Sequence, residues 1–83
     1  MRIYMETRIE LDDERKARAI IASLEPDNIG IPEGISLEVL QDQSEVVVRL
    51  ICESERILTC RSTLDEILML IDKTRKVLFE DLQ

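Results

Sequence analysis

The sequence predicts an α+β fold, in which a three-stranded antiparallel sheet with strand order 1-3-2 carries both helices on one face. Three segments alternate apolar and polar residues as strands do, and two repeat apolar residues at helical spacing. These elements follow in the order strand, helix, strand, strand, helix. A right-handed crossover between the first two strands leaves a gap that the third fills, antiparallel to both.

The first two elements are a strand and a short helix. Residues 3–11 alternate strictly, which predicts a half-buried strand. Asp12 and Asp13 supply N-cap character, and apolar residues then recur at i, i+3, i+4 and i+7, as in an amphipathic helix. Pro26 ends this helix, because the residue before a proline avoids helical geometry.

A loop and a hairpin come next. Residues 25–34 contain both prolines and both glycines and are predicted to form the main loop. Alternation from Ile35 onward predicts a second strand, residues 41–44 form a polar turn, and the β-branched segment 45–52 returns as the third strand.

The last helix is predicted to run from about Ser54 to about Asp81. An apolar row with alternating spacings of three and four keeps its phase throughout, which favours one helix. Thr63 and Glu66 form a capping-box pattern, so a break there stays open as an alternative. The row consists of Ile57, Cys60, Leu64, Ile67, Ile71, Thr74 and Leu78.

The apolar residues of this helix exceed what one face can bury. Residues 67–71 are all apolar and go more than once around the helix. Met69, Leu70 and Val77 lie off the row, so we expect a partner protein to cover them. The alternative is that the first helix covers this second stripe.

The outer face of the predicted sheet also carries apolar residues. An apolar patch there favours dimerisation through this face, whereas scattered surface residues are the simpler interpretation. The predicted dimer-face residues are Tyr4, Leu40, Val47 and Ile51.

Length and charge limit the function. The 83 residues fit a single domain, residues 1–83. A net charge of −7 and only two aromatic residues argue against autonomous nucleic-acid binding. No secretion signal or bilayer-spanning segment is visible, so we expect a cytoplasmic protein without a membrane partner.

The sequence offers no group for catalysis. It contains no histidine and no glycine-rich phosphate loop, so we predict no enzyme activity and no cofactor. Cys52 and Cys60 are interpreted as reduced thiols, and two thiolates alone do not complete a tetrahedral zinc site.

Two segments resemble a known family. "ARAIIASLEPDN" (17–28) and "RSTLDEILMLI" (61–71) resemble stretches of the small dimeric, Pcc1-type subunit of the KEOPS complex. In the second segment Arg61, Thr63, Leu64, Leu68 and Ile71 match the family pattern. The family's Asn-Ser pair, arginine and tryptophan are replaced by Asp65-Glu66, Met69 and Leu70, as in a diverged paralogue.

The resemblance implies a non-catalytic scaffold subunit. Such a subunit dimerises through its sheet and packs its helices on the catalytic threonylcarbamoyl-transferase subunit, and it meets tRNA only as part of the complex. An alternative is a small-molecule-sensing regulatory domain, for which "NIGIPEG" is the candidate ligand loop. The predicted partner-binding residues are Arg61, Thr63, Leu64, Asp65, Glu66, Leu68, Met69, Leu70, Thr74 and Val77.

Overall fold

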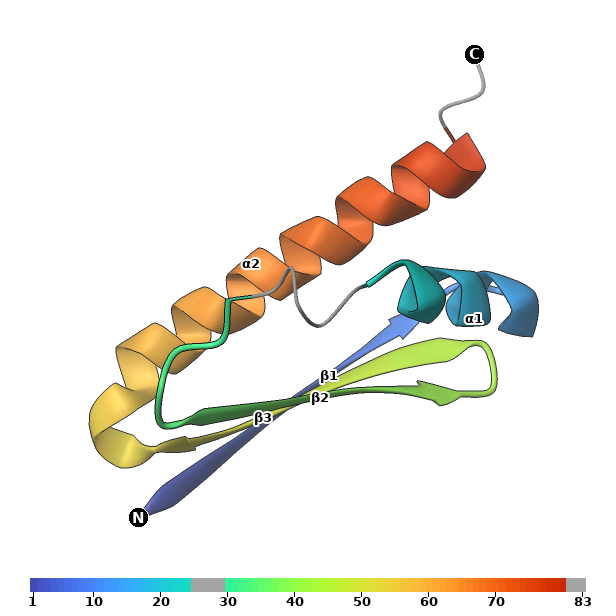
Figure 1. Ribbon diagram of the computed structural model, residues 1–83. Helices are drawn as coiled ribbons and strands as arrows, with labels where there is room; N and C mark the ends of the chain where they lie inside the picture. Colours follow the sequence, from blue (N-terminus) through green and yellow to red (C-terminus); the bar gives the residue numbers. More distant parts are fainter. Residues whose placement is uncertain (25–29, 81–83) are drawn as a thin grey trace.

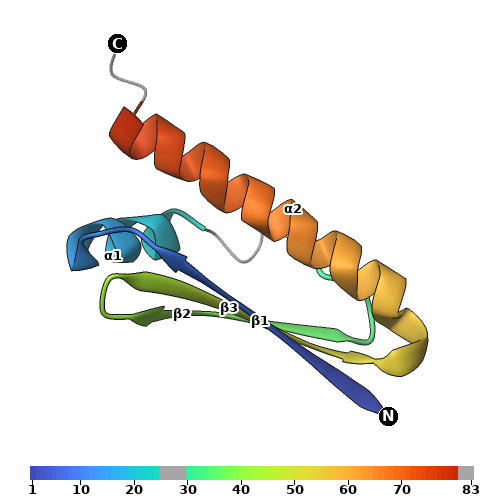
Figure 2. The ribbon, with the colours of Figure 1, turned by 180° about the vertical axis from the view of Figure 1, so that it is seen from behind.

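The computed structural model describes residues 1–24 and 30–80, which form one sheet with both helices on the same side (Figures 1 and 2). The predicted α+β fold is confirmed. In chain order the elements are β1 (Arg2–Glu10), α1 (Glu14–Ser23), β2 (Ile35–Asp42), β3 (Glu45–Glu53), η2 (Ser54–Arg56), α2 (Ile57–Arg75) and η3 (Lys76–Glu80).

The sheet has the order β1-β3-β2, with β3 antiparallel to both neighbours, as predicted. Its register is continuous: Arg2 lies opposite Glu53 at one end of the β1–β3 pair and Glu10 opposite Glu45 at the other. Because side chains alternate along a strand, this register places Ile3, Leu37, Val48 and the residues in phase with them on the face beneath the helices, whereas Tyr4, Leu40, Val47 and Ile51 lie on the outer face.

Helix α1 begins where the sequence places its cap. The Asp13 side chain accepts a hydrogen bond from the backbone N–H of Arg15 at 2.7 Å. Asp12 precedes it with φ 68°, a left-handed conformation that aspartate tolerates better than most residues. The predicted stop at Pro26 lies outside the described residues.

The hairpin turn is shorter than predicted. Gln41 and Asp42 belong to β2, and only Gln43 and Ser44 connect it to β3. Gln43 adopts φ 56°, and the Gln41 amide donates to the carbonyl oxygens of Glu14 and Gln43, both at 3.0 Å. The polar side chain of Gln41 is therefore hydrogen-bonded although the residue is part of the strand.

Helix α2 is unbroken from Ile57 to Arg75, so the capping-box pattern at Thr63 and Glu66 starts no new helix. The helix opens after the short 3₁₀ turn η2 and widens into the π-helical turn η3 at its end. The predicted single helix is confirmed over this range, and Asp81 lies outside the described residues. Figure 1 shows the C-terminal part of α2 rising away from the sheet, with α1 beneath it.

The core forms two clusters between the sheet and the helices. One joins α1 to β3 and the middle of α2, and includes Ile20, Val48 and Ile67. The other lies at the start of α2, around Ile35, Leu50 and the two cysteines. Half-buried Leu64 packs against both clusters.

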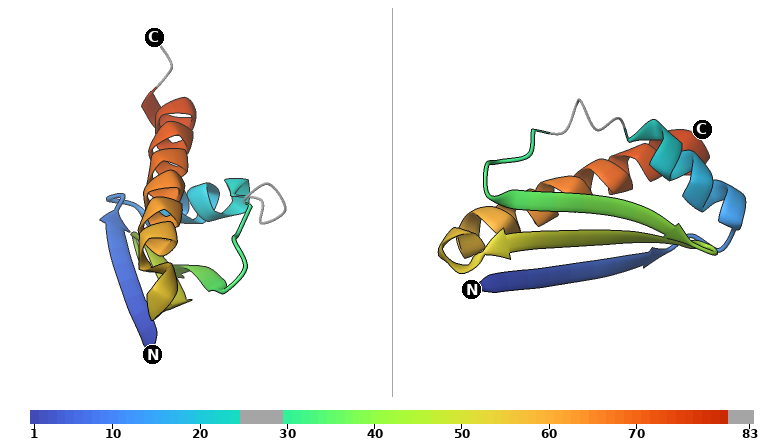
Figure 3. Two further views of the ribbon diagram at one scale, coloured as in Figure 1. Left: turned by 90° about the vertical axis from the view of Figure 1, so that its left-hand side faces the viewer. Right: turned by 60° about the horizontal axis from the view of Figure 1, so that its bottom comes forward.

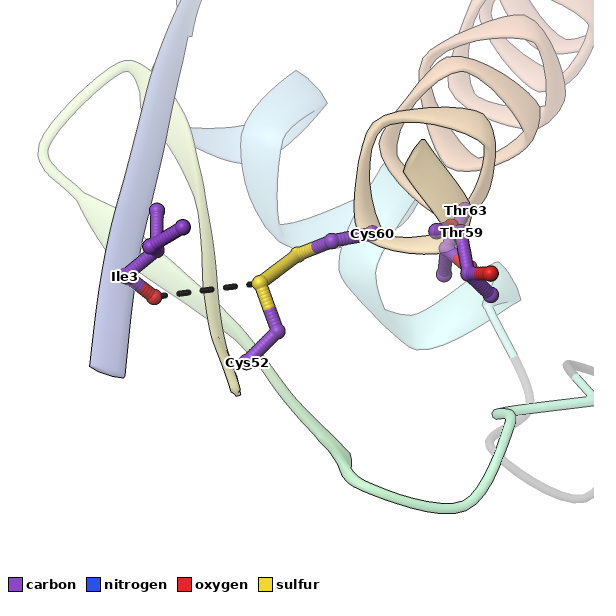
Figure 4. The surroundings of a disulfide bond; sticks show 5 residues. All are labelled: Ile3, Cys52, Thr59, Cys60 and Thr63. Carbon is purple, nitrogen blue, oxygen red and sulfur yellow. Dashed lines mark hydrogen bonds between the residues drawn. A yellow bond between two sulfur atoms is a disulfide. The ribbon is translucent and has the colours of Figure 1, made fainter. Parts of the chain in front are cut away.

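The prediction of two reduced thiols is wrong in this structure, because Cys52 and Cys60 form a disulfide (Figure 4). Their Cα atoms lie 6.4 Å apart, within the range that a disulfide spans. The bond ties β3 to the first turns of α2, and both residues are buried. It arises because η2 turns the chain so that Cys60 faces the sheet, a geometry that sequence spacing did not reveal.

Candidate protein-interaction surfaces

The described residues contain no cluster of three or more side chains that could hold a metal ion. None of the helices within residues 1–24 and 30–80 combines the length and apolar character that a membrane span needs. The structure does contain two surfaces with chemistry suited to other macromolecules. One runs along α2 and the other is the outer face of the sheet.

Apolar side chains remain exposed towards the end of α2 and in η3. Leu70 is 38% exposed, Met69 59% and Val77 63%. Helix α1 packs beneath α2 but leaves these side chains in contact with solvent, so the alternative in which it covers the second stripe does not describe this structure. Leaving such side chains in water forgoes on the order of 1.5–3 kcal/mol each of possible burial.

A shallow hollow continues this surface where α2 passes the end of α1. It has a volume of about 280 Å³ and is lined by Ser23, Lys73, Thr74, Val77 and Leu78. The Thr74 hydroxyl is turned inward along its own helix, where it donates to the Leu70 carbonyl at 2.8 Å. The hollow is therefore mainly apolar, with Lys73 at its edge.

The other predicted partner-binding residues differ in exposure, according to the side of α2 on which they lie. Arg61, Asp65 and Glu66 are exposed, and Leu68 is half-buried on the flank. Thr63 differs from the prediction, because it is only 5% exposed and its hydroxyl donates to the Thr59 carbonyl at 2.8 Å. That intrahelical bond lets a threonine face the core, so Thr63 is not available to a partner without rearrangement.

The sequence interpretation missed Leu58, which is 77% exposed on the first turn of α2. It lies on the side of the helix away from the sheet, as does Met69 roughly three turns later. Its signal was present in the sequence, because Leu58 stands opposite the buried row at helical spacing. The predicted contacts did not include the apolar residues directly opposite the row.

The outer sheet face is more charged than the apolar pattern suggested. Val47, one of the predicted dimer-face residues, is only 1% exposed, whereas Tyr4 is 72% exposed. Leu40 and Ile51 are half-buried. Val47 differs from the prediction because it occupies the central strand, between Arg8 of β1 and Leu40 of β2.

Two arginines organise this face into an ion-pair network. Arg8 contacts Glu6 at 3.1 Å, Asp42 at 2.8 Å and Glu45 at 3.0 Å. Arg49 contacts Glu6 at 2.8 Å. The hydrogen bonds from Arg49 and Arg8 hold the pKa of the Glu6 carboxyl below its usual value, and the hydrogen bonds to Asp42, Glu6 and Glu45 raise the pKa of Arg8.

Beside the network the twisted sheet forms a hollow of about 530 Å³. Carboxylates outnumber arginines across the whole face, so a second copy stacked on it would bring like charges together. The hollow is lined by Tyr4, Glu6, Ser36, Leu37, Glu38, Arg49 and Ile51. The acidic residues of the face are Glu6, Glu10, Glu38, Asp42, Glu45 and Glu53, against Arg2, Arg8 and Arg49.

The loop considered for a small-molecule sensor is described only in part, since residues 28 and 29 lie outside the described residues. Gly34 has φ 86°, and a side chain there would approach Arg56. A positive φ favours glycine, so the turn into β2 explains why Gly34 is a glycine, and no ligand is needed to explain it.

Comparison with known proteins decides the family. A family model described as "Transcription factor Pcc1" matches residues 4–73. The chain belongs to the Pcc1 family. This is the family of small KEOPS subunits that the two sequence segments resemble, and that resemblance is confirmed.

A solved Pcc1 structure has the same fold. The structure "Crystal structure of binary complex Gon7-Pcc1" matches with a TM-score of 0.76 and 21% identity, over 92% of this chain and 91% of that one. No curated protein sequence matches the chain. The Pcc1 match ends before Thr74 and Val77, so the apolar hollow at the end of α2 lies mostly beyond the matched residues.

Proposed function

We propose that this chain is a non-catalytic scaffold subunit of a KEOPS-type complex that installs threonylcarbamoyladenosine on tRNA. It lies in the cytoplasm, dimerises through its sheet and packs α2 on the catalytic threonylcarbamoyl-transferase subunit. tRNA meets the chain only within the assembly, because the acidic surface attracts no phosphate backbone by itself. Membership of the Pcc1 family supports this proposal.

The observation that carries the proposal is the exposed apolar side of α2. The helix is continuous over 19 residues and still exposes Met69 and Leu70, and Val77 is exposed in the π-helical turn η3 that follows it. Amphipathic helices commonly bind partners through apolar anchors spaced at helical intervals. Of the predicted contacts, Arg61, Asp65 and Glu66 would form a polar rim, while Leu64 and Leu68 would stiffen the helix from the core side.

The direct test uses Leu70→Asp in a binding experiment with the catalytic subunit. A carboxylate at the centre of an apolar interface loses hydration without gaining a partner, so we expect binding to weaken at least tenfold. Isothermal titration calorimetry measures the affinity, and circular dichroism checks that the variant stays folded.

The matched control is Ile57→Asp, which places the same carboxylate on the same helix at an apolar residue of similar exposure, 42%, that lies on another side of the helix from Leu70 and was not predicted to bind. We expect it to leave the affinity within about twofold. Equal losses in both variants would show that charge on α2, and not the Leu70 position, causes the effect. An unaffected Leu70→Asp variant would contradict the proposed interface.

A further inference from the structure

We infer that the partner binds α2 with a helix that carries one large apolar side chain between a cation and a carboxylate, with the cation opposite Glu66 and the carboxylate opposite Lys73. The inference rests on the proposed contact with the catalytic subunit and adds the chemistry that this subunit must present. It concerns the stripe formed by Glu66, Leu70 and Lys73 of α2 and Val77 of η3. In the left view of Figure 3, α1 lies beside α2 on one side only.

The two charged residues of the stripe bracket Leu70. Glu66 lies four residues before it and Lys73 three residues after it, and residues at these spacings are neighbours on the surface of a helix. Both charged side chains are exposed. With a rise of about 1.5 Å per residue, Glu66 and Lys73 are roughly 10 Å apart along the helix axis.

Neither charge is neutralised within residues 1–24 and 30–80, where neither side chain forms an ion pair or a hydrogen bond. On α2 and η3, the residues three and four positions from Glu66 include no cation, and those from Lys73 include no carboxylate. The next acidic residue differs, because Asp72 contacts Arg75 at 2.7 Å and Lys76 at 3.2 Å. Glu66 and Lys73 are therefore available to charges on a partner.

The hollow beside Lys73 is suited to an apolar side chain. Its two hydroxyl groups, those of Ser23 and Thr74, each donate to a carbonyl oxygen of their own helix at 2.8 Å. An apolar group can therefore cover them without breaking a hydrogen bond, and it would also contact Val77 and Leu78. A volume of about 280 Å³ gives room for a large side chain.

One helix of the partner can supply all three groups. Residues seven apart lie on the same side of a helix, so a cation and a carboxylate at that spacing match the separation of Glu66 and Lys73. The apolar anchor supplies most of the binding free energy, whereas the charges fix the direction in which the helix lies along α2. In the opposite direction a carboxylate would face Glu66 and a cation would face Lys73, and both pairs would repel. The family pattern has a serine in place of Glu66, so this charge order is a feature of this chain.

A charge exchange that keeps the net charge tests the inference. The double variant Glu66→Lys, Lys73→Glu reverses the order of the two charges, but the total charge that attracts or repels the partner at long range stays the same. We expect its affinity for the catalytic subunit to fall at least tenfold in isothermal titration calorimetry at low salt. Raised salt should shrink this difference.

The matched control exchanges two charges outside the stripe. Glu55→Arg, Arg56→Glu makes an equivalent change at exposed residues of η2, and we expect it to leave the affinity within about twofold. Equal losses in both double variants would contradict the inference, because the position of the charges would then not matter. Circular dichroism checks the fold of each variant. If the stripe variant does not fold, Glu66→Gln and Lys73→Gln replace it, and unchanged affinity in both would contradict the inference.

The result for Leu70→Asp separates this inference from the proposed function. Loss of binding by Leu70→Asp together with full binding by the stripe double variant would overturn the charge order and leave the α2 interface standing. Failure of the unmodified chain to bind the catalytic subunit would overturn both.

Discussion

At the scale of single residues, two side chains that were expected to be exposed, those of Thr63 and Val47, are buried. Thr63 enters the core because its hydroxyl bonds along its own helix, and Val47 is covered although its strand face points outward. Alternation predicted the direction of Val47, whereas the prediction for Thr63 was a contact with a partner protein. The sequence pattern could not predict whether neighbouring side chains would close over these residues, because that depends on tertiary contacts.

Glu6 should contribute to stability in a pH-dependent way. Hydrogen bonds from Arg49 and Arg8 lower its pKa in the folded protein below the usual value of a glutamate. A lowered folded pKa means that the contribution is fully present above the unfolded pKa and is lost as pH falls through the folded one. We therefore expect Glu6→Gln to lower the melting temperature slightly at pH 7 and to have no effect once the pH is below both pKa values.

Thermal melts of both proteins across this pH range check the prediction, and raised salt at pH 7 should shrink the difference because the pairs are exposed. A difference that persists unchanged at the lowest pH would contradict it.

Ile67 should be among the residues on which stability depends most. It is 1% exposed in the cluster that joins α2 to the sheet. Ile67→Ala removes buried methylene groups and leaves a cavity, so we expect the free energy of unfolding to fall by about 2–5 kcal/mol. Met69→Ala, a truncation two residues away at an exposed position, should change it by about 0.5 kcal/mol or less. Urea unfolding measures both, and similar losses would show that the helix is buried on a different side.

At the scale of elements, the sequence predicted each strand and helix because periodicity is a local property. Nine alternating residues of β1 and the cap at Asp13 were sufficient for their elements. The errors occurred where two elements meet. The turn between β2 and β3 is shorter than its polar composition suggested, and the contact between Cys52 and Cys60 depends on the turn η2.

The disulfide should contribute measurably to stability. It closes a short loop between β3 and α2, and bonds of this kind typically stabilise by about 2–4 kcal/mol. We expect the Cys52→Ala, Cys60→Ala double variant to unfold at correspondingly lower urea concentration than the oxidised protein. Because both cysteines are buried, reductant should act on the native protein only slowly. Two freely titrating thiols in the purified, unreduced and denatured chain would contradict the bond.

The disulfide is unusual for a protein with the proposed cytoplasmic location. Structural disulfides are rare in cytosolic proteins, with intracellular proteins of hyperthermophiles as the main exception. A buried bond between β3 and α2 strengthens a domain whose core is necessarily small, since a chain of this size hides only roughly 60% of its unfolded surface. It also fixes the start of α2 relative to the sheet, and with it the orientation of the exposed apolar side chains.

At the scale of the whole molecule, the two proposed contacts fall on two different surfaces. The exposed apolar side of α2 suits a helical partner, and the sheet is the proposed dimer surface. Figure 3 shows α2 and the sheet as separate layers of the molecule, so we expect one copy to use both surfaces at once. Such an arrangement would let a dimer hold two catalytic subunits. The sequence indicated the first surface through its surplus of apolar residues, and it also predicted the strand order of the sheet.

The most direct test of this account is the mass of the chain in solution, measured by light scattering alone and after addition of the catalytic subunit from the same organism. We predict a dimer alone and a larger complex with catalytic subunits bound, which Leu70→Asp fails to form. A folded monomer that forms no complex with the catalytic subunit would contradict the account.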